Sequence, residues 1–278
     1  MEIKVKTPAK INLTLEITGK RPDGFHELKS IMQMIDLYDY LTFDIQKSEN
    51  FEINLSGSNP NIPYDDRNIV YKAIKLFMDK TNFAPHMFNI YIDKNIPSEA
   101  GLAGGSSNAA GTFLVLNEYF DNPLNKKELH ELCAKLGSDL NVCLEGGCTL
   151  AKGRGEIVEP ITFREYPVAL IKPPVGISAK EGYQKYAQME NKQQNNFTEK
   201  MIECLSENKD IKPFLYNDLE KAVFPYYEDL QKIKSKNPKS IMSGSGSTYF
   251  VLNEVINPVE DFWIKGNLKT ISTGCEIL

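Results

Sequence analysis

A glycine-rich stretch, "NIPSEAGLAGGSSNAAG" at residues 95–111, constrains the fold of this chain more than any other segment. It holds Gly101, Gly104 and Gly105, followed by Ser106 and Ser107, and it leads into a helix that we predict over residues 106–120. Glycines let a ligand approach the backbone, and a helix start directs unpaired N–H groups and its positive dipole end at that place. The segment therefore predicts an anion-binding loop, with an ordinary serine-capped glycine turn as the alternative.

Two common phosphate-binding motifs do not fit this loop. A Walker A loop ends in Gly-Lys-Ser or Gly-Lys-Thr, whereas Gly105 is followed by Ser106 and Ser107. A dinucleotide fingerprint requires G-x-G-x-x-G directly after a strand, but position 103 is alanine and Pro97 precedes the loop. A second glycine loop, "MSGSGST" at residues 242–248, is by itself equally typical of a hairpin turn.

The remaining pattern predicts a mixed α+β fold of two lobes. In "KINLTLEITG" apolar residues alternate with polar ones, so this segment is a half-buried strand whose polar face carries Lys10 and Asn12. We also predict strands at 29–37, 40–46, 50–55, 87–93, 167–171, 239–242 and 248–252, and helices at 67–80, 125–137, 178–187, 217–235 and 257–265. The glycines and charges of "AKGRGEIVEP" indicate a boundary, with one domain at 1–158 and another at 159–278.

Charge and cysteine content narrow the classes of protein. The formal net charge is −5, which disfavours general attraction to nucleic acids or anionic membranes, so any phosphate must be bound locally. The five cysteines are scattered without a metal-binding spacing, and no window approaches the roughly 18 apolar residues of a membrane span. We expect a cytoplasmic protein with reduced thiols and no protein-bound metal centre.

Five motifs in order are similar to those of the GHMP kinases, the superfamily of galactokinase, homoserine kinase, mevalonate kinase and phosphomevalonate kinase. They are "PAKINLTLEI", "RPDGFHEL", "IPSEAGLAGGSSNAA", "LGSDLNVCLEGGCTLAKGRGE" and "MSGSGST", and together they span nearly the whole chain. The resemblance implies an S5-like N-terminal lobe and a ferredoxin-like C-terminal lobe with the active site between them. It is strongest to the branch that uses ATP to phosphorylate the 2-hydroxyl of a cytidine diphosphate-linked methylerythritol in isoprenoid synthesis.

The resemblance assigns the ATP-binding residues to the central loop. In these kinases, backbone amides of this loop surround the ATP phosphates, which agrees with the anion-binding prediction. The implied residues are Pro97, Ser98, Glu99, Ala100, Gly101, Leu102, Ala103, Gly104, Gly105, Ser106 and Ser107. Glu99 departs from the usual small residue and brings a negative charge to a polyphosphate site.

The catalytic residues implied by the resemblance are Lys10 and Asp139. Lys10 lies in the Pro-Ala-Lys-x-Asn motif with Asn12, which is assigned to the substrate, and Asp139 follows Gly137 and Ser138. A carboxylate within hydrogen-bond reach can accept the proton of a hydroxyl as it attacks phosphorus, while an ammonium keeps the carboxylate ionised. Without the resemblance, Asp139 is as readily a helix-start carboxylate and Lys10 a solvated charge.

The resemblance also implies an acceptor pocket for a pyrimidine base. Phe25 and Tyr183 occupy the two aromatic positions that sandwich the cytosine ring, and His26 reads the edge of the base. A core aromatic is the alternative for Tyr183. Phe25 replaces a common tyrosine, which keeps the stacking face, and Asn141 stands where proline or serine is common.

The sequence also gives expectations for the metal ion, the binding partners and the alternative functions. No carboxylate is a clear magnesium ligand, so we expect Mg²⁺ to be held mainly by ATP, water and a loop serine. The expected partner is a small molecule, without nucleic acid or membrane, and the chain is expected to be a monomer or homodimer. The alternatives are a mevalonate- or homoserine-type kinase, and a non-catalytic binding module built on the S5-like lobe.

Overall fold

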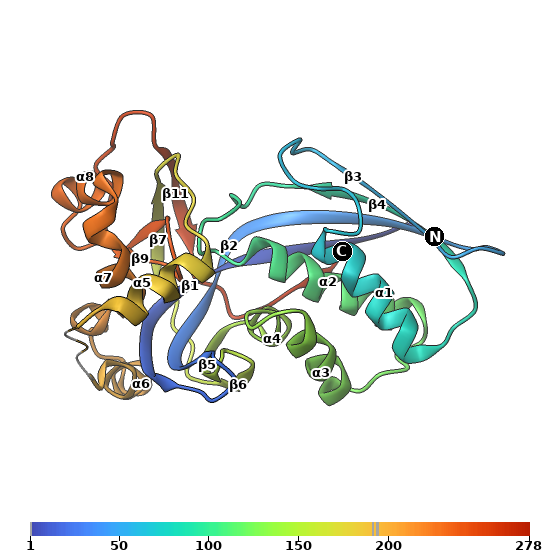
Figure 1. The fold of residues 1–278 in the computed structure, drawn as a ribbon, viewed down its shortest axis with the longest axis horizontal. Helices are drawn as coiled ribbons and strands as arrows, with labels where there is room; N and C mark the ends of the chain where they lie inside the picture. Colours follow the sequence, from blue (N-terminus) through green and yellow to red (C-terminus); the bar gives the residue numbers. More distant parts are fainter. Residues whose placement is uncertain (1, 191, 193–194) are drawn as a thin grey trace.

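The computed structural model describes residues 2–190, 192 and 195–278, and within them it forms two β-sheets with packed helices (Figure 1). The larger sheet contains β1 (Glu2–Lys20), β2 (His26–Lys47), β3 (Glu52–Gly57), β4 (His86–Asp93), β5 (Cys148–Gly153), β6 (Ile157–Pro160), β8 (Tyr216–Asn217) and β12 (Glu276–Ile277). The smaller sheet contains β7 (Pro167–Lys172), β9 (Ile241–Met242), β10 (Tyr249–Leu252) and β11 (Trp263–Lys269), in the order β11-β7-β10-β9.

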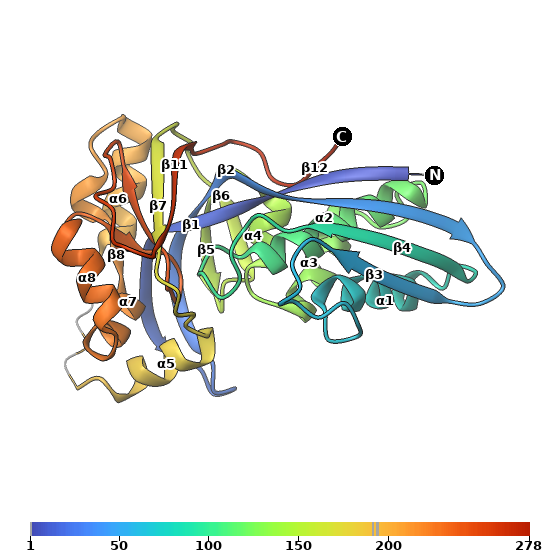
Figure 2. The same cartoon turned by 90° about the horizontal axis from the view of Figure 1, so that it is seen from above.

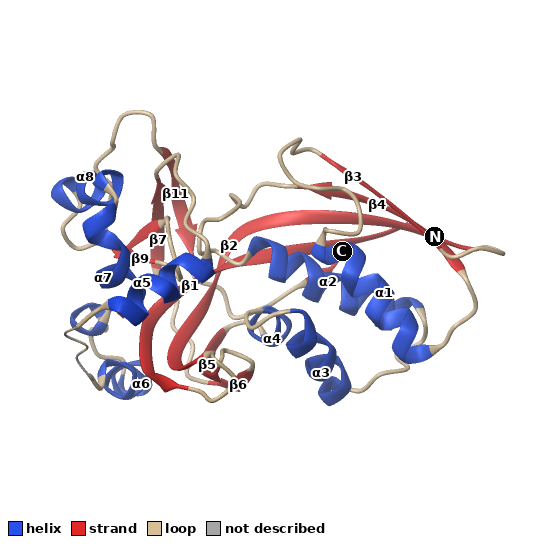
Figure 3. Cartoon of the chain, viewed as in Figure 1, coloured by secondary structure: helices blue, strands red, loops and turns tan. Residues whose placement is uncertain are grey.

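The helices form two groups, one along the larger sheet and one at the end of the molecule that holds the smaller sheet (Figure 3). The first group contains α1 (Ile69–Thr81), α2 (Gly104–Tyr119), α3 (Lys126–Leu136) and α4 (Leu140–Glu145). The second contains α5 (Ala179–Gln188), α6 (Phe197–Glu207), α7 (Asp218–Val223) and α8 (Glu228–Lys236), with short 3-10 helices η1 (Lys212–Phe214) and η2 (Phe224–Tyr226). No helix in the described part of the chain is long and apolar enough to cross a membrane.

The two longest strands, β1 and β2, pair antiparallel along most of their length. Strands β7 and β11 of the smaller sheet run across the direction of this pair (Figure 2). The first half of β2 pairs with β5 and its second half with β4. Our prediction of two strands, at 29–37 and 40–46, was therefore wrong. The chain stays extended through the change of partner because β1 remains paired on its other edge.

One face of the large sheet packs on α1–α4 through an apolar core. Its largest fully buried members are Phe43 of β2, Phe77 of α1, Phe88 of β4 and Phe113 of α2. Helix α2 packs against α1, α4 and β1, so its start is held at the centre of the fold (Figure 1). The glycine-rich loop before it is thereby fixed on a rigid base.

Two of the predicted C-terminal helices differ in the structure. The helix predicted at 217–235 is interrupted by η2, where Pro225 lacks a backbone N–H and separates α7 from α8. The helix predicted at 257–265 was wrong, because residues 263–269 form β11, which pairs with the edge of β7. Pro258 and the left-handed Asp261, at φ 63°, disfavour a helix there.

The sequence analysis also missed several short elements, α4, β5, β6 and α6. The segment "MENKQQNNFTEK" at 189–200 is polar, as is typical of an exposed loop, but residues 197–200 lie in α6; residues 191, 193 and 194 are outside the described part. The carboxylate of Glu16 in β1 accepts the backbone N–H groups of Phe197 and Thr198, at 3.1 and 3.0 Å. Helix α6 therefore begins where a distant strand supplies its acceptor, which local sequence cannot reveal.

The two-lobed α+β arrangement that we predicted is confirmed, with strands exchanged between the lobes. Strands β8 and β12 come from the C-terminal part of the chain and pair with β1 of the large sheet. One apolar cluster contains Ile11 and Ile31 together with Leu170, Met201 and Phe250. The lobes thus share a core, and a domain boundary between residues 158 and 159 stays a prediction.

Candidate active site

The glycine-rich loop joins β4 to α2 in a backbone conformation suited to an anion. Three of its residues, Glu99, Gly101 and Ala103, have left-handed φ values of 48°, 71° and 56°. Helix α2 has no side-chain cap and no acidic residue in its first turn. The N–H groups of residues 104–106 precede the first helical bond, which Ser107 N–H donates to Ala103 at 2.9 Å. The helix start is therefore open to an anionic ligand, as the sequence predicts.

The second glycine loop supports the first one. The hydroxyl of Ser243 donates to the carbonyl of Gly101 at 2.9 Å, and the N–H of Thr248 donates to Ala100 at 3.3 Å. A Cβ on Gly101 would lie 2.0 Å from the carbonyl oxygen of Ser243, so only glycine fits. Asn217, which the sequence analysis missed, donates to the carbonyls of Met242 and Gly244 at 2.7 and 2.8 Å.

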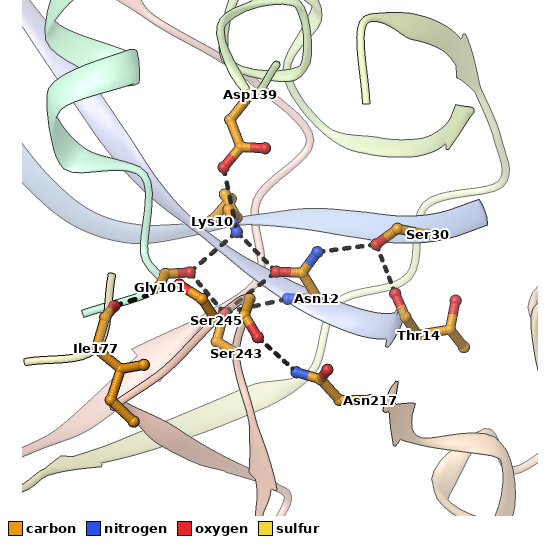
Figure 4. A network of polar contacts seen from close by, with 11 residues as sticks. Lys10, Asn12, Thr14, Ser30, Gly101, Asp139, Ile177, Asn217, Ser243 and Ser245 are labelled. Atoms are coloured by element: carbon orange, nitrogen blue, oxygen red, sulfur yellow. Dashed lines mark hydrogen bonds and ion pairs between the residues drawn. The ribbon is translucent and has the colours of Figure 1, made fainter. Parts of the chain in front are cut away.

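Lys10 and Asp139 meet beside these loops (Figure 4). The Lys10 side chain is almost completely buried, and its Nζ donates to Asn12 Oδ1 at 2.7 Å and to the carbonyl of Gly101 at 3.0 Å. The same Nζ lies 3.5 Å from Asp139 Oδ2, and the Asp139 side chain keeps 31% exposure. The lysine is thus fixed in place, while the carboxylate remains accessible to a ligand.

Asn12 acts on Lys10 from the same strand. Its side-chain oxygen accepts from Lys10, and its amide nitrogen donates to Ser30 Oγ at 2.8 Å. Ser30 in turn donates to the backbone carbonyl of Thr14 at 2.5 Å. Because both ends of the amide are engaged inside the protein, Asn12 orients the ammonium of Lys10 in this structure.

Two cavities adjoin at the glycine-rich loop. The smaller pocket, of about 430 Å³, is lined by residues 97–106 of that loop and by Ile62, Pro63, Arg67, Asn68, Ile69, Ile92, Lys94 and Asn108. The larger pocket, of about 680 Å³, is lined by residues that include Lys10, Asn12, Phe25, Asp139 and Tyr183. Gly101, Ala103 and Ser106 line both. Lys10 and Asp139 line the larger pocket, and Lys10 reaches the wall shared with the smaller one through its bond to the carbonyl of Gly101.

The aromatic residues of the larger pocket are not arranged as an open sandwich. The rings of His26 and Tyr183 stack on each other, with centroids 5.2 Å apart and planes 16° apart. Phe25 is 52% exposed, in the turn between β1 and β2. Burial, together with the charges of Lys20 and Lys192, lowers the pKa of His26. The His26 ring thus covers Tyr183, and base stacking between Phe25 and Tyr183 stays a prediction.

Ser107 and Glu99 are placed apart from the other loop residues. The Ser107 side chain is fully buried, and its Oγ lies 3.7 Å from Cys275 Sγ, away from both pockets. Glu99 lines the smaller pocket, but its carboxylate extends toward the loop before α5, where a Cβ on Gly176 would lie 2.5 Å from Oε2. The buried Lys172 is within electrostatic range of Glu99. The negative charge of Glu99 thus extends toward the other lobe.

A buried ion pair beneath the loop was missed by the sequence analysis. Lys94 Nζ lies 2.8 Å from Asp39 Oδ2, and both side chains are at most 5% exposed. Asp39 Oδ1 also accepts the N–H groups of Asn95 and Ile96, each at 2.7 Å. Burial lowers the pKa of Lys94, and Asp39 opposes that shift. The sequence offered one signal for this pair: Lys94 directly precedes the glycine-rich stretch. If that position is buried, its ammonium needs a carboxylate partner.

Comparison with known proteins gives consistent matches. Residues 68–147 match the family model of the GHMP kinases N terminal domain. A 4-diphosphocytidyl-2-C-methyl-D-erythritol kinase of Prochlorococcus marinus (strain MIT 9515) is 36% identical, over 99% of this chain and 93% of the relative. The crystal structure of a 4-(cytidine 5'-diphospho)-2C-methyl-D-erythritol kinase aligns with a TM-score of 0.74 at 28% identity, over 91% of this chain and 90% of that one.

A homoserine kinase from Cytophaga hutchinsonii has a similar fold. It aligns with a TM-score of 0.76 over 100% of this chain and 97% of its own, at 15% identity. Identity at that level shows a shared fold and nothing about the acceptor. The overall architecture therefore carries no information on what is phosphorylated.

Proposed function

This chain belongs to the 4-diphosphocytidyl-2-C-methyl-D-erythritol kinases of the GHMP kinase superfamily, and from that premise we propose how its residues act. It is an ATP-dependent small-molecule kinase of the isoprenoid pathway, with 4-diphosphocytidyl-2-C-methyl-D-erythritol as its acceptor. The observation that carries the assignment of roles is the ion pair of Lys10 and Asp139, which lies in the larger pocket beside the wall shared with the smaller one.

The smaller pocket is proposed to hold ATP. The N–H groups at the start of α2 and the left-handed loop residues would surround the phosphates, from Pro97 through Ser106. Ser107 is left out of the direct contacts because its side chain is buried and its N–H is already bonded. The apolar side chains of Ile62, Pro63 and Ile69 would pack on the purine, with the Asn68 and Lys94 segments around it.

The larger pocket is proposed to hold the acceptor, with its 2-hydroxyl beside Asp139. As the hydroxyl oxygen bonds to the γ-phosphorus, the bond from phosphorus to the bridging oxygen of ADP breaks and Asp139 takes the hydroxyl proton. Lys10 would stabilise the carboxylate and the charge on the transferred group, since its ammonium is held 3.5 Å from Asp139. No covalent enzyme intermediate is needed.

Mg²⁺ is proposed to arrive with ATP. The ion would be bound mainly by phosphate oxygens and water, the hard oxygen ligands that it prefers. The hydroxyl of Ser106, which lines both pockets, would supply a protein oxygen. The ion would neutralise phosphate charge during transfer. Cytoplasmic location, a monomeric or homodimeric state and the absence of nucleic-acid and membrane partners stay predictions.

An ADP-release assay with purified protein tests the assignment of roles. We expect turnover with the cytidine diphosphate-linked acceptor but not with mevalonate or homoserine. Asp139→Asn should reduce kcat roughly 10²- to 10⁴-fold, with ATP binding within about twofold of wild type. Transfer by Asp139→Asn at the wild-type rate would contradict the base assignment. Stabilisation of the protein by mevalonate and not by cytidine nucleotides would favour a mevalonate-type kinase instead.

A further inference from the structure

Arg154 lies against the aromatic residue at the mouth of the larger pocket. It occupies the turn between β5 and β6, and it is one of the residues that line that pocket. Its guanidinium carbon is 4.9 Å from the centroid of the Phe25 ring. Because the Phe25 side chain is 52% exposed, this contact restrains a ring that would otherwise be loosely held.

The turn that carries Arg154 is firmly built. Gly153 and Gly155 have φ values of 72° and 115°, which other residues rarely adopt. Glu156 accepts the Arg154 N–H at 2.6 Å, and its carboxylate lies 3.6 Å from Arg154 Nε. Asn141 donates its side-chain amide to the carbonyl of Glu156 at 2.5 Å. The turn is thus tied to α4, the helix that begins directly after Asp139.

The wall of the larger pocket is positively charged although the chain as a whole is negative. Among the described residues that line it, the basic ones are Lys10, Lys20, Arg154 and Lys180, and the acidic one is Asp139. Lys10 is paired with that aspartate. Lys20, Arg154 and Lys180 are the other basic residues of the lining, and the charge of Arg154 is partly offset by Glu156 at 3.6 Å, whereas the formal net charge of the chain is −5. A lining of this kind favours an anionic ligand.

We propose that Arg154 is a specificity-determining residue for the acceptor: it holds Phe25 as a stacking surface for the base and offers its guanidinium edge to the diphosphate. A planar guanidinium can stack on a ring through its face while its N–H groups bind phosphate oxygens. Both contacts select a nucleoside diphosphate over a small hydroxy acid. The inference rests on the proposed function, because it assumes that the acceptor occupies the larger pocket.

Steady-state kinetics of Arg154→Gln and Arg154→Lys test this role. For Arg154→Gln we expect the acceptor KM to rise roughly tenfold, with kcat and the ATP KM within about twofold, because one charged hydrogen bond is lost. Arg154→Lys should retain part of the charge effect and lose the flat stacking contact. Lys152→Gln is the matched control, since Lys152 is nearby on β5 and pairs with Glu159 at 2.8 Å outside the pocket. Its constants should equal those of wild type.

Competitive inhibition shows whether Arg154 contributes to recognition of the acceptor or only to the stability of the fold. With cytidine and CDP as inhibitors, Arg154→Gln should raise the inhibition constant of CDP about tenfold and that of cytidine by less. If the inhibition constants of CDP and cytidine rise equally, Arg154 does not contact the diphosphate. If both inhibition constants stay at the wild-type values and only Tm falls, Arg154 has a structural role and the proposal is overturned. If wild type does not phosphorylate the acceptor, the proposed function itself fails. If wild type is active and Arg154→Gln has the same kinetic and inhibition constants, only the role of Arg154 is contradicted.

Discussion

Glu99 adds backbone strain and a negative charge at one position of the glycine-rich loop. Its φ of 48° is in the left-handed region, which costs a non-glycine residue roughly 1–2 kcal/mol. Its side chain leaves the wall of the smaller pocket toward Gly176, and its carboxylate lies within electrostatic range of Lys172. A bound triphosphate would be repelled by this charge, although Lys172 partly compensates it. Because ATP is proposed to bind in this pocket, we predict that Glu99 limits ATP affinity.

Replacing Glu99 separates the electrostatic cost from the conformational one. Glu99→Gln and Glu99→Gly should both lower the ATP KM about threefold, because each removes the same charge beside the smaller pocket. Only Glu99→Gly should raise Tm, by about 2 °C, because it also removes backbone strain. An ADP-release assay at low and high salt, with thermal melts, measures both effects. An ATP KM that stays at the wild-type value in Glu99→Gln would show that the charge is not felt.

His26 gives the fold a dependence on mild acid. Burial and the charges of Lys20 and Lys192 lower its pKa in the folded state below the ordinary value of 6.5. As pH falls from 6.5 through the lower folded pKa, the unfolded chain binds the proton first, so stability is lost in that window. His26→Phe, which keeps a ring against Tyr183, should lose less Tm than wild type between pH 7.5 and 5.5. Equal losses in both proteins would refute this dependence.

At the level of elements, the sequence predicts those parts of the candidate site that depend on residues close together in the chain. The glycine-rich loop, the start of α2 and the alternation that places Lys10 and Asn12 on one face of β1 were visible in local spacing. The prediction that this strand is half-buried was wrong, because residues 7–17 are buried on both faces, with the other lobe packed against the polar side. The contact of Lys10 with Asp139 was not, because it joins β1 to the segment before α4 across the fold. It was expected only through family resemblance. The pairing of Lys94 with Asp39 depends on burial, which local pattern did not indicate.

The contact between the two glycine loops sets a strict limit on side-chain size. In Gly101→Ala the new methyl would meet the carbonyl of Ser243 at 2.0 Å, at a φ of 71°. We expect Tm to fall by about 3 °C or more and the ATP KM to rise at least roughly tenfold, because the loops must separate. Gly266→Ala in β11 is the matched control, since a methyl group on Gly266 would meet no described atom within 4 Å. Wild-type Tm in Gly101→Ala would contradict this packing.

At the scale of the whole molecule, the two lobes are joined by more than a linker. Strand β1 pairs with β2 along its length and with β8 near its end, at Thr14 and Leu15. The N–H of Ile17 donates to Asp218 of α7 at 2.7 Å. Together with the shared apolar cluster, these contacts couple the N-terminal and C-terminal parts. The glycine-rich loop and the residues of the larger pocket are thereby held by one continuous structure.

Cooperative unfolding follows from this shared core. Cys133 of α3 and Cys204 of α6 are both buried and lie on opposite sides of residue 158, and the single tryptophan, Trp263, is in β11. Pulsed alkylation of each cysteine across a urea gradient should give the same midpoint as Trp263 fluorescence. An ATP analogue should shift all three midpoints equally, because ligand bound to the folded state stabilises the whole unit. A lower midpoint for Cys204 than for Cys133 would show that the C-terminal lobe unfolds first, and would favour two independent domains.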